Sequence, residues 1–332
     1  MHNIPLILED YLNYMETIKG TSPNTTKEYF FDLRTFFRFI KLRYKLVDSS
    51  TPFDEIDISD VDLELIKKIN LQDLHAFVSY IDKNRDNENS TKSRKISSLR
   101  SFFGYLYSKV NLITKNPAEN LESPKPDSRH PVYLTLEECE ILLKTVLENK
   151  NEFFRKRDYA IILLFLNCGL RLSELSSIDL NKIKKDTLTV IGKGNKERTV
   201  YLNKACIDAI NDYIAVRPKD AIDKNALFLS KRKRRMSNRA IQHMIDKYLE
   251  KAGFDTSIYS THKLRHTAAT LMYKYGNVDI RALQQILGHA NVSTTQIYTH
   301  IDDERLREAV KSNPLANIKP ISSTKDLKSN KE

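Results

Sequence analysis

Residues 287–300 read LGHANVSTTQIYTH, and the segment before them, residues 261–276, reads THKLRHTAATLMYKYG. The first segment places His289 shortly before Tyr298, and the second places His262 and Arg265 on adjacent turns of an expected helix. The chain has 16 tyrosines, and a lone tyrosine usually serves packing. Either segment alone is therefore a weak signal, and its meaning depends on what lies upstream.

Two upstream segments add charged side chains at defined positions. Residues 167–180, NCGLRLSELSSIDL, place Glu174 one helical turn after Arg171, so the acid could orient the guanidinium. An ordinary surface ion pair is the more common meaning of this spacing. Residues 190–200, VIGKGNKERTV, place Lys193 in a glycine-containing turn, where a backbone can approach another group closely. This segment is not a Walker P-loop, because it lacks the second glycine and the hydroxyl residue of that pattern.

A metal site is an alternative interpretation of part of this pattern. His266 follows His262 at the spacing of a zinc-binding histidine pair. No acid follows the first histidine and no cysteine is near, so we expect a buried or stacking role for His266, and neither a metal nor a cofactor. The cysteines Cys139, Cys168 and Cys206 form no CxxC pair, which argues against a disulfide framework and a thiolate zinc site.

The joint presence and order of these segments carry more information than any one of them. In sequence order they supply Arg171, Lys193, His262, Arg265, His289 and Tyr298. The motifs around them, GLRxSEL, GKGNKER, HxLRHT, LGH and TTQIYTH, resemble those of the tyrosine recombinases, and GKGNKER and LGHANVSTTQIYTH are similar to the Xer recombinases within that family. The resemblance covers residues 134–311, and more loosely the amino-terminal helical part. An acidic insertion near residues 48–64 and the tail after residue 313 depart from it.

The resemblance implies a metal-independent cleavage of DNA at one phosphate. Arg171 and Arg265 would clamp the nonbridging oxygens, where the extra negative charge of the pentavalent phosphoryl group collects. His289 would donate a further hydrogen bond. Positioning and electrostatics would thus supply the catalysis, and the expected enzyme needs no cofactor.

The other three residues would supply the nucleophile and move protons. Tyr298 is the expected nucleophile, and since a free tyrosine has a pKa of about 10 it needs a base, for which His262 is the candidate. Lys193 is the candidate acid that protonates the leaving 5′ oxygen. The implied product is a 3′-phosphotyrosyl DNA, which preserves the energy of the broken bond and requires no ATP.

The resemblance also implies an assembly and a task. Four protomers would hold two duplexes with inverted-repeat sites and exchange strands through a Holliday junction, with a helix at residues 302–311 docking on a neighbour. A Xer-type enzyme would resolve chromosome dimers at a terminus site during cell division. A DNA translocase and a paralogous recombinase are candidate partners.

Other functions stay open at this point. An integrase of a mobile element or a plasmid resolvase would use the same chemistry, and a type IB topoisomerase would relax supercoils without a partner site. A catalytically inactive DNA-binding protein would keep only the fold. The two-part layout and the Xer-like motifs favour the chromosomal enzyme, and an inactive protein has no reason to retain all six groups.

The composition fits a protein that binds a polyanion. Of 332 residues, 29% are charged and 40% hydrophobic, and the net charge of +11 lies in the second part, because residues 1–125 carry 18 basic and 18 acidic side chains. Six of those acids lie within residues 54–64, a stretch without a base. No apolar run approaches the roughly 20 residues that span a bilayer, and the first residues do not resemble a signal peptide. We therefore expect a cytoplasmic, nucleoid-associated protein.

A proline-rich polar segment marks the expected domain boundary, because proline resists helix and removes a backbone donor. The predicted fold class is mainly α: a four-helix, SAM-like core-binding domain, then an α-rich catalytic domain with a small antiparallel sheet. The predicted parts are residues 1–115 for the DNA-binding domain, 116–131 for the linker, 132–317 for the catalytic domain and 318–332 for a polar tail.

Local patterns place several elements. Ser22 before Pro23 predicts a helix start, and apolar residues from Tyr29 to Ile40 recur at helical spacing, which indicates a core stripe. Amphipathic segments at residues 71–83 and 91–110 predict further helices. The β-prone runs at residues 188–191 and 197–202 predict a hairpin.

Two basic segments are candidate DNA contacts, although a solvated helix face would have the same pattern. One is the polar half of the helix expected at residues 91–110. The other is the run KRKRR at residues 231–235, which leads into an expected helix. The candidate residues are Lys92, Arg94, Lys95, Arg100, Arg234, Arg235 and Arg239.

Overall fold

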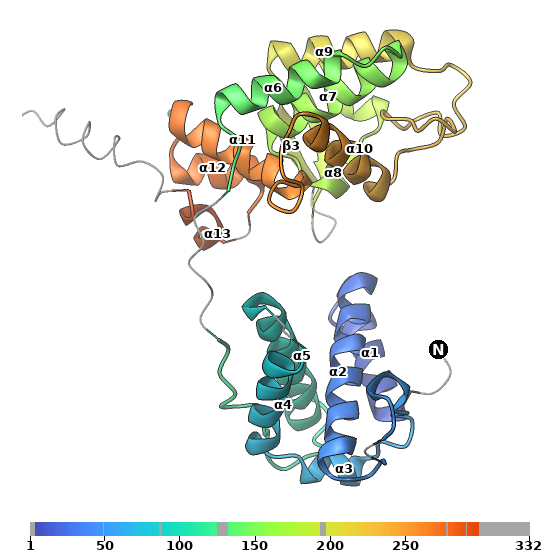
Figure 1. Ribbon diagram of the computed structural model, residues 1–332, viewed down its shortest axis with the longest axis vertical. Coiled ribbons are helices and arrows are strands. Elements are labelled where there is room, and N and C mark those ends of the chain that lie inside the picture. The colour runs from blue at the N-terminus through green and yellow to red at the C-terminus, as the bar shows by residue number, and fades with distance from the viewer. Residues whose placement is uncertain are drawn as a thin grey trace, which may run out of the picture. The chain divides into compact units, whose positions relative to one another are not determined.

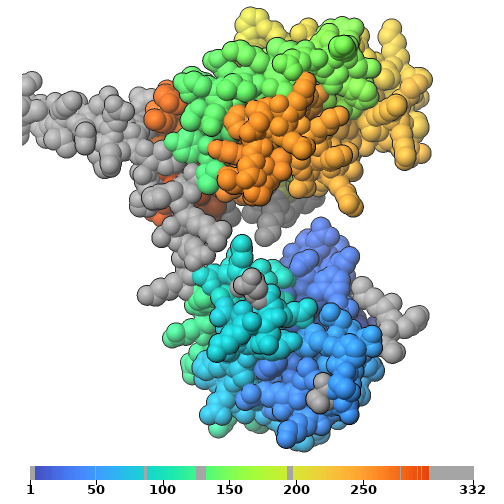
Figure 2. All heavy atoms as spheres, viewed as in Figure 1, coloured from blue at the N-terminus to red at the C-terminus, as the bar shows by residue number. Residues whose placement is uncertain are grey.

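The chain divides into two compact units, residues 1–128 and residues 129–332, which are described one at a time (Figure 1). Figure 2 shows all heavy atoms of the chain from the same side. No helix in the described ranges is both long and apolar enough to cross a membrane. The computed structural model describes residues 4–48, 50–85, 88–124, 132–192, 197–276, 278–289 and 291–298.

The first unit is a helical bundle. Its helices are α1 (Leu6–Thr17), α2 (Pro23–Arg43), α3 (Leu63–Lys68), α4 (Leu71–Lys83) and α5 (Asn89–Ser108), with a 3-10 turn η1 (Phe53–Glu55) before α3. The predicted start of α2 is confirmed, since the Ser22 side chain accepts a hydrogen bond from the Thr25 amide and Pro23 occupies the first turn. A capping box of Asn70 and Asp73 opens α4.

An aromatic core holds the bundle together. Phe36 and Phe37 of α2, Phe77 of α4, and Phe102 and Phe103 of α5 are fully buried. The rings of Phe36 and Phe77 meet edge to face at a centroid distance of 5.2 Å. The apolar stripe of α2 is therefore core, as its spacing predicted.

The acidic insertion folds back on α2. Lys41 Nζ lies 2.7 Å from Asp60 Oδ1, and Arg38 Nη1 lies 3.2 Å from Asp54 Oδ1. Ile56 and Ile58 of the insertion are buried. The segment thus covers two bases of α2 and offsets their charge.

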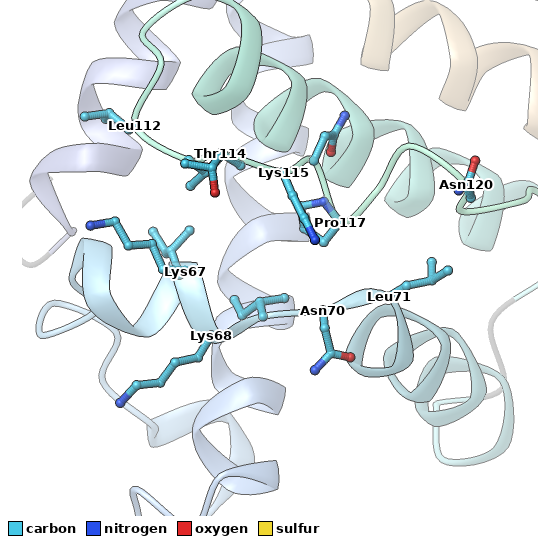
Figure 3. Close-up of a pocket in the computed structure, with 13 residues that line it drawn as sticks. Lys67, Lys68, Asn70, Leu71, Leu112, Thr114, Lys115, Pro117 and Asn120 are labelled. Atoms are coloured by element: carbon cyan, nitrogen blue, oxygen red, sulfur yellow. The ribbon is translucent and has the colours of Figure 1, made fainter.

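The first part of the predicted linker packs on the first unit. Ala118 and Leu121 are 1% exposed and belong to its aromatic core, while residues 125–131 lie outside the described ranges. A hollow of about 630 Å³ separates the α3–α4 junction from the segment after α5, and Figure 3 shows Lys67, Lys68 and Lys115 around it. None of the five predicted catalytic residues that the structure describes lines this hollow.

The second unit is built around one buried helix. Its helices are α6 (Leu136–Leu147), α7 (Glu152–Cys168), α8 (Leu172–Ser176), α9 (Lys204–Val216), α10 (Asn238–Lys251), α11 (Thr261–Tyr275), α12 (Ile280–Leu287) and α13 (Ser293–Gln296). Helix α7 packs against α6, α9 and α11, and its residues from Ala160 to Leu166 are all at most 7% exposed. A helix that is apolar on every side belongs in a core.

A small antiparallel sheet lies beside these helices in the second unit. Its strands run in the order β1 (Ile183–Lys184), β2 (Thr187–Ile191) and β3 (Glu197–Tyr201), after a 3-10 turn η2 (Leu180–Lys182). Val190 of β2 pairs with Arg198 of β3. The predicted hairpin and the mainly α fold class are confirmed, while the turn at residues 193–196 lies outside the described ranges.

Candidate active site

Four of the six predicted catalytic side chains line one cavity of about 550 Å³ in the second unit. These are Arg171, His262, Arg265 and His289. Asn238 of α10 also faces this cavity. A hollow with two guanidiniums on its wall suits an anion. The cavity is lined by Leu170, Arg171, Leu172, Ser173, Asn238, Gln242, Ser260, Thr261, His262, Arg265, His289 and Thr294.

Arg171 is held by the start of α8. It is the N-cap residue, and its amide donates to Glu174 Oε2 at 2.8 Å while its Nη1 donates to Glu174 Oε1 at 2.8 Å. Glu174 is fully buried, so the pair is no surface ion pair, and the acid orients the guanidinium. Gly169 turns the chain from α7 into this segment at a φ of 57°, a left-handed conformation that favours glycine.

Arg265 is fixed from α11 by backbone oxygens. Its side chain is 5% exposed, and its Nη2 donates to the Leu287 carbonyl at 2.6 Å, while Nη1 donates to the Gly169 carbonyl. Both carbonyls lie at helix C-terminal ends, which carry partial negative charge. Burial and the neighbouring Arg171 lower the pKa of Arg265 to about 10, so the guanidinium stays protonated at neutral pH.

The C-terminal end of α12 binds three arginines that lie around Glu174. Three successive carbonyl oxygens, left without helical partners, each accept a hydrogen bond from a different arginine. The pairs are Arg198 with Ile286, Arg265 with Leu287, and Arg171 with Gly288.

His289 follows this helix end directly. Its Nδ1 lies 2.9 Å from Thr295 Oγ1, and its carbonyl accepts from Gln284 Nε2 at 3.0 Å. Burial, with Arg265 and Arg171 nearby, lowers the pKa of His289 to about 4. The ring is therefore neutral at pH 7 and keeps one N–H to donate.

Tyr298 lies beside the cavity, not on its wall. It is 1% exposed and packs with Ala269, Leu283 and Leu287. Its phenol oxygen is 2.6 Å from Nδ1 of His266. Burial raises the pKa of Tyr298 to about 12 and lowers that of His266 to about 4, so the phenol donates to a neutral imidazole.

The tyrosine contact differs from the sequence interpretation, which paired Tyr298 with His262. The ring of His262 meets that of His266 edge to face at a centroid distance of 4.6 Å, and it is His266 that touches the phenol. Both histidines lie on one side of α11 because they are one turn apart. The predicted buried or stacking role of His266 agrees with this position, but its partner was not foreseen.

Arg198 is a second residue that the sequence interpretation missed. Its Nη2 lies 2.8 Å from Glu174 Oε2, and its side chain is 14% exposed. On β3 it faces the same side as the buried Val200. An arginine at an inward strand position indicates a buried acid partner, and that signal was present in GKGNKER. Lys193 in the same motif and the helix predicted at 302–311 lie outside the described residues.

The candidate DNA contacts of α5 are engaged within the first unit. Lys92 pairs with Asp82, and Arg100 donates to Ser123 Oγ at 3.3 Å and to the Leu121 carbonyl. Arg94 and Lys95 both pair with the buried Asp32, at 2.5 and 3.1 Å. The Lys95 side chain is only 10% exposed, so it has little surface to offer a phosphate.

The candidates near α10 differ among themselves. Arg234 and Arg239 are exposed. Arg235 is half-buried, pairs with Asp179 and donates to the Ser176 and Ile178 carbonyls at 3.0 and 3.1 Å. Arg235 therefore braces the loop before α10.

Comparison with known proteins adds independent information. A sequence model of the phage integrase family matches residues 133–305. The chain is 59% identical over 313 residues to the tyrosine recombinase XerC of Caldanaerobacter subterraneus subsp. tengcongensis, covering 94% of this chain and 88% of that protein. The tyrosine recombinase XerC of Thermodesulfovibrio yellowstonii is 35% identical over 326 residues, covering 95% and 99%.

Solved structures share the fold. The XerH site-specific recombinase bound to a palindromic difH substrate, a post-cleavage complex, superposes with a TM-score of 0.69 at 20% identity, covering 92% of this chain and 95% of that one. The Tn1549 transposon integrase in complex with transposon right end DNA gives a TM-score of 0.68 at 20% identity, covering 92% and 98%.

Proposed function

This chain belongs to the phage integrase family and is a site-specific tyrosine recombinase, and we propose that it breaks and rejoins DNA through a covalent bond between Tyr298 and a 3′ phosphate. The observation that carries the proposal is the cavity that Arg171 and Arg265 line, with Tyr298 hydrogen-bonded to His266, the residue directly after Arg265. The cavity supplies the anion site, and the tyrosine supplies the nucleophile.

The two arginines stabilise the pentavalent phosphoryl group. Glu174 and the carbonyls at the end of α12 already fix both guanidiniums, so little reorganisation accompanies the reaction. Their remaining N–H groups bind the nonbridging oxygens, and the neutral His289 donates one more hydrogen bond. Bidentate arginine contacts match the geometry of these oxygens.

The nucleophile must change position and lose a proton. In the described arrangement Tyr298 is buried and hydrogen-bonded to His266, with a pKa of about 12. We propose that DNA binding turns the phenol into the cavity. There His262 is the base within reach, because His262 lines the cavity and His266 does not.

Bonds and protons are accounted for in each step of this reaction. The Tyr298 oxygen forms the bond to phosphorus, the bond from phosphorus to the 5′ oxygen breaks, and the phenol proton passes to His262. Lys193, in the segment that joins β2 to β3, gives a proton to the leaving 5′ oxygen. A 5′ hydroxyl from a second duplex reverses these steps and joins the exchanged strand without ATP.

The biological task follows from the named relatives. Proteins called XerC match nearly the whole chain, and the XerH complex holds a palindromic substrate. We therefore infer an inverted-repeat DNA site, a tetramer on two duplexes, and resolution of chromosome dimers at the nucleoid in the cytoplasm during cell division. A DNA translocase and a paralogous recombinase are the proposed partners. The alternative is integration of a mobile element or plasmid resolution by the same chemistry, for which the transposon integrase is the structural parallel.

DNA contacts are proposed for bases of the two basic segments whose side chains are exposed or partly exposed. Phosphate contacts would set the register of each unit on the duplex. Lys95 is left out because it has the most buried side chain of these bases, and Arg235 because Asp179 and two backbone carbonyls together hold its guanidinium. The proposed contacts are Lys92, Arg94, Arg100, Arg234 and Arg239.

Replacement of the nucleophile tests the function. With a nicked substrate that traps the cleaved strand, the unaltered protein should accumulate a denaturant-resistant protein–DNA adduct, and Tyr298→Phe should form none while binding DNA normally. Tyr201→Phe is the matched control, since that tyrosine is 76% exposed on β3 and outside the cavity. An adduct that persists in Tyr298→Phe would refute the assignment.

A further inference from the structure

Arg198 occupies a central position without lining the cavity. Its Nη2 lies 2.8 Å from Glu174 Oε2 and its Nε 3.3 Å from Oε1, so it holds both carboxylate oxygens. Its Nη1 donates to the Ile286 carbonyl. A Cβ atom on Gly288 would come within 2.9 Å of Arg198 Cδ, so this side chain packs directly on the backbone that precedes His289.

Glu174 is shared among competing arginines. Its Oε2 accepts from Arg198 Nη2 at 2.8 Å, while Arg265 Nη1 lies 3.9 Å from the same oxygen, beyond hydrogen-bond distance. Burial raises the pKa of Glu174, but hydrogen bonds from Arg198 and Arg171 outweigh it, so the carboxyl is ionised. A guanidinium that donates to Glu174 Oε2 therefore points toward this buried carboxylate and away from the cavity.

We propose that Arg198 is a positioning residue for strand cleavage: it occupies Glu174 and the end of α12, and so leaves Arg265 and Arg171 directed at the scissile phosphate. This inference rests on the proposed function. Without Arg198, Glu174 Oε2 keeps only the Arg171 amide as a donor, and Arg265 is near enough to take the place of Arg198. An Arg265 that closes onto Glu174 turns away from the cavity.

The charge balance supports this role. Arg171, Arg198 and Arg265 carry three positive charges around one buried carboxylate. Arg198 and Arg171 share that carboxylate, so a net positive charge remains on the cluster, and two of its arginines, Arg171 and Arg265, line the cavity. Buried charge of one sign without a partner is costly, and an entering phosphate supplies the partner.

The experiment compares Arg198→Met, which removes the charge and keeps the volume, with Arg198→Lys. A lysine can reach Glu174 but cannot hold both oxygens and the Ile286 carbonyl together. The rate of adduct formation with a nicked substrate should fall about 10- to 100-fold in Arg198→Met, the scale known for residues that orient metal ligands, and less in Arg198→Lys. DNA affinity should be unchanged. Glu197→Gln is the control, because Glu197 on the same strand makes an exposed ion pair with Lys182.

A second substrate separates positioning from simple loss of stability. A methylphosphonate at the cleavage position has a methyl group in place of one nonbridging oxygen and carries no negative charge. The two arginines therefore contribute less to its cleavage rate. The ratio of unaltered to Arg198→Met rates should shrink toward one on this substrate. An equal ratio on both substrates, or an equal loss of DNA affinity, would overturn the inference. If Arg198→Met does not fold, Arg198→Lys carries the same comparison.

A double variant tests the route through Glu174. If Arg198 acts by occupying that carboxylate, Arg198→Met should cost little further activity in a Glu174→Gln background. Additive losses would contradict the mechanism. The unaltered protein in the same assay separates the two hypotheses: no Tyr298 adduct at all would reject the proposed function, whereas a normal adduct rate in Arg198→Met would reject only the role of Arg198.

Discussion

A buried carboxylate gathers basic side chains in each unit, with opposite results. In the first unit Asp32, 2% exposed, accepts from Arg94 and Lys95 of α5 and from Ser98 Oγ at 2.7 Å. In the second unit Glu174, fully buried, is surrounded by three arginines.

The two clusters differ in where their positively charged side chains point. The Asp32 cluster joins α2 to α5, and its bases do not line the hollow at the α3–α4 junction. The Glu174 cluster directs Arg171 and Arg265 into a cavity beside a tyrosine. The same elementary interaction therefore cross-links helices in one unit and builds an anion site in the other.

Glu174→Gln should give the largest effect, because it removes the charge that orients the arginines. We expect the adduct rate to fall by about 100-fold, the scale of a roughly 1 Å misplacement of reacting groups. The measurement is single-turnover cleavage at saturating DNA. Asp179→Asn, which loosens the loop-bracing pair with Arg235, is the control. A Glu174→Gln protein that cleaves at the normal rate would show that Glu174 does not orient the arginines of the anion site.

Asp32→Asn should act on stability instead. It leaves the Lys95 ammonium buried without its carboxylate, and breaking a buried pair costs about 3–5 kcal/mol. Hydrogen exchange should show the loss in α2 and α5, with the α7 amides unchanged. Ser98→Ala, which removes only a neutral partner, should cost about 1 kcal/mol. Equal exchange rates in Asp32→Asn and the unaltered protein would show that the cluster is not a cross-link.

Acid should weaken the second unit through its histidines, with a smaller effect. The pKa values of His266 and His289 are about 4 in the folded chain, below the ordinary 6.5. The unfolded chain therefore binds more protons between about pH 6.5 and pH 4, and stability falls as pH decreases through that window. Urea unfolding across this range measures it. His266→Gln should flatten the dependence, and the exposed His75→Gln should not. A dependence unaltered by His266→Gln would contradict the pKa shift.

Much of this arrangement was predictable from local pattern. The aromatic stripe of α2 and the hairpin strands follow from periodicity, and Arg171, His262, Arg265 and His289 share one cavity as their motifs implied.

Long-range packing decided the rest. Periodicity cannot show that Lys95 meets Asp32, which lies on another helix. His262 and His266 share a helix side, so only the packing of α12 and α13 decides which of them meets Tyr298. Arg198 was hidden for the same reason, since its partners come from α8 and α12.

In the proposed reaction, the phenol oxygen of Tyr298 becomes bonded to a DNA phosphorus next to Arg171 and Arg265. Mass spectrometry of the digested adduct tests it most directly. We expect a single modified peptide that carries a nucleotide on Tyr298 through its 3′ phosphate. A nucleotide on another residue, or one joined through a 5′ phosphate, would contradict it.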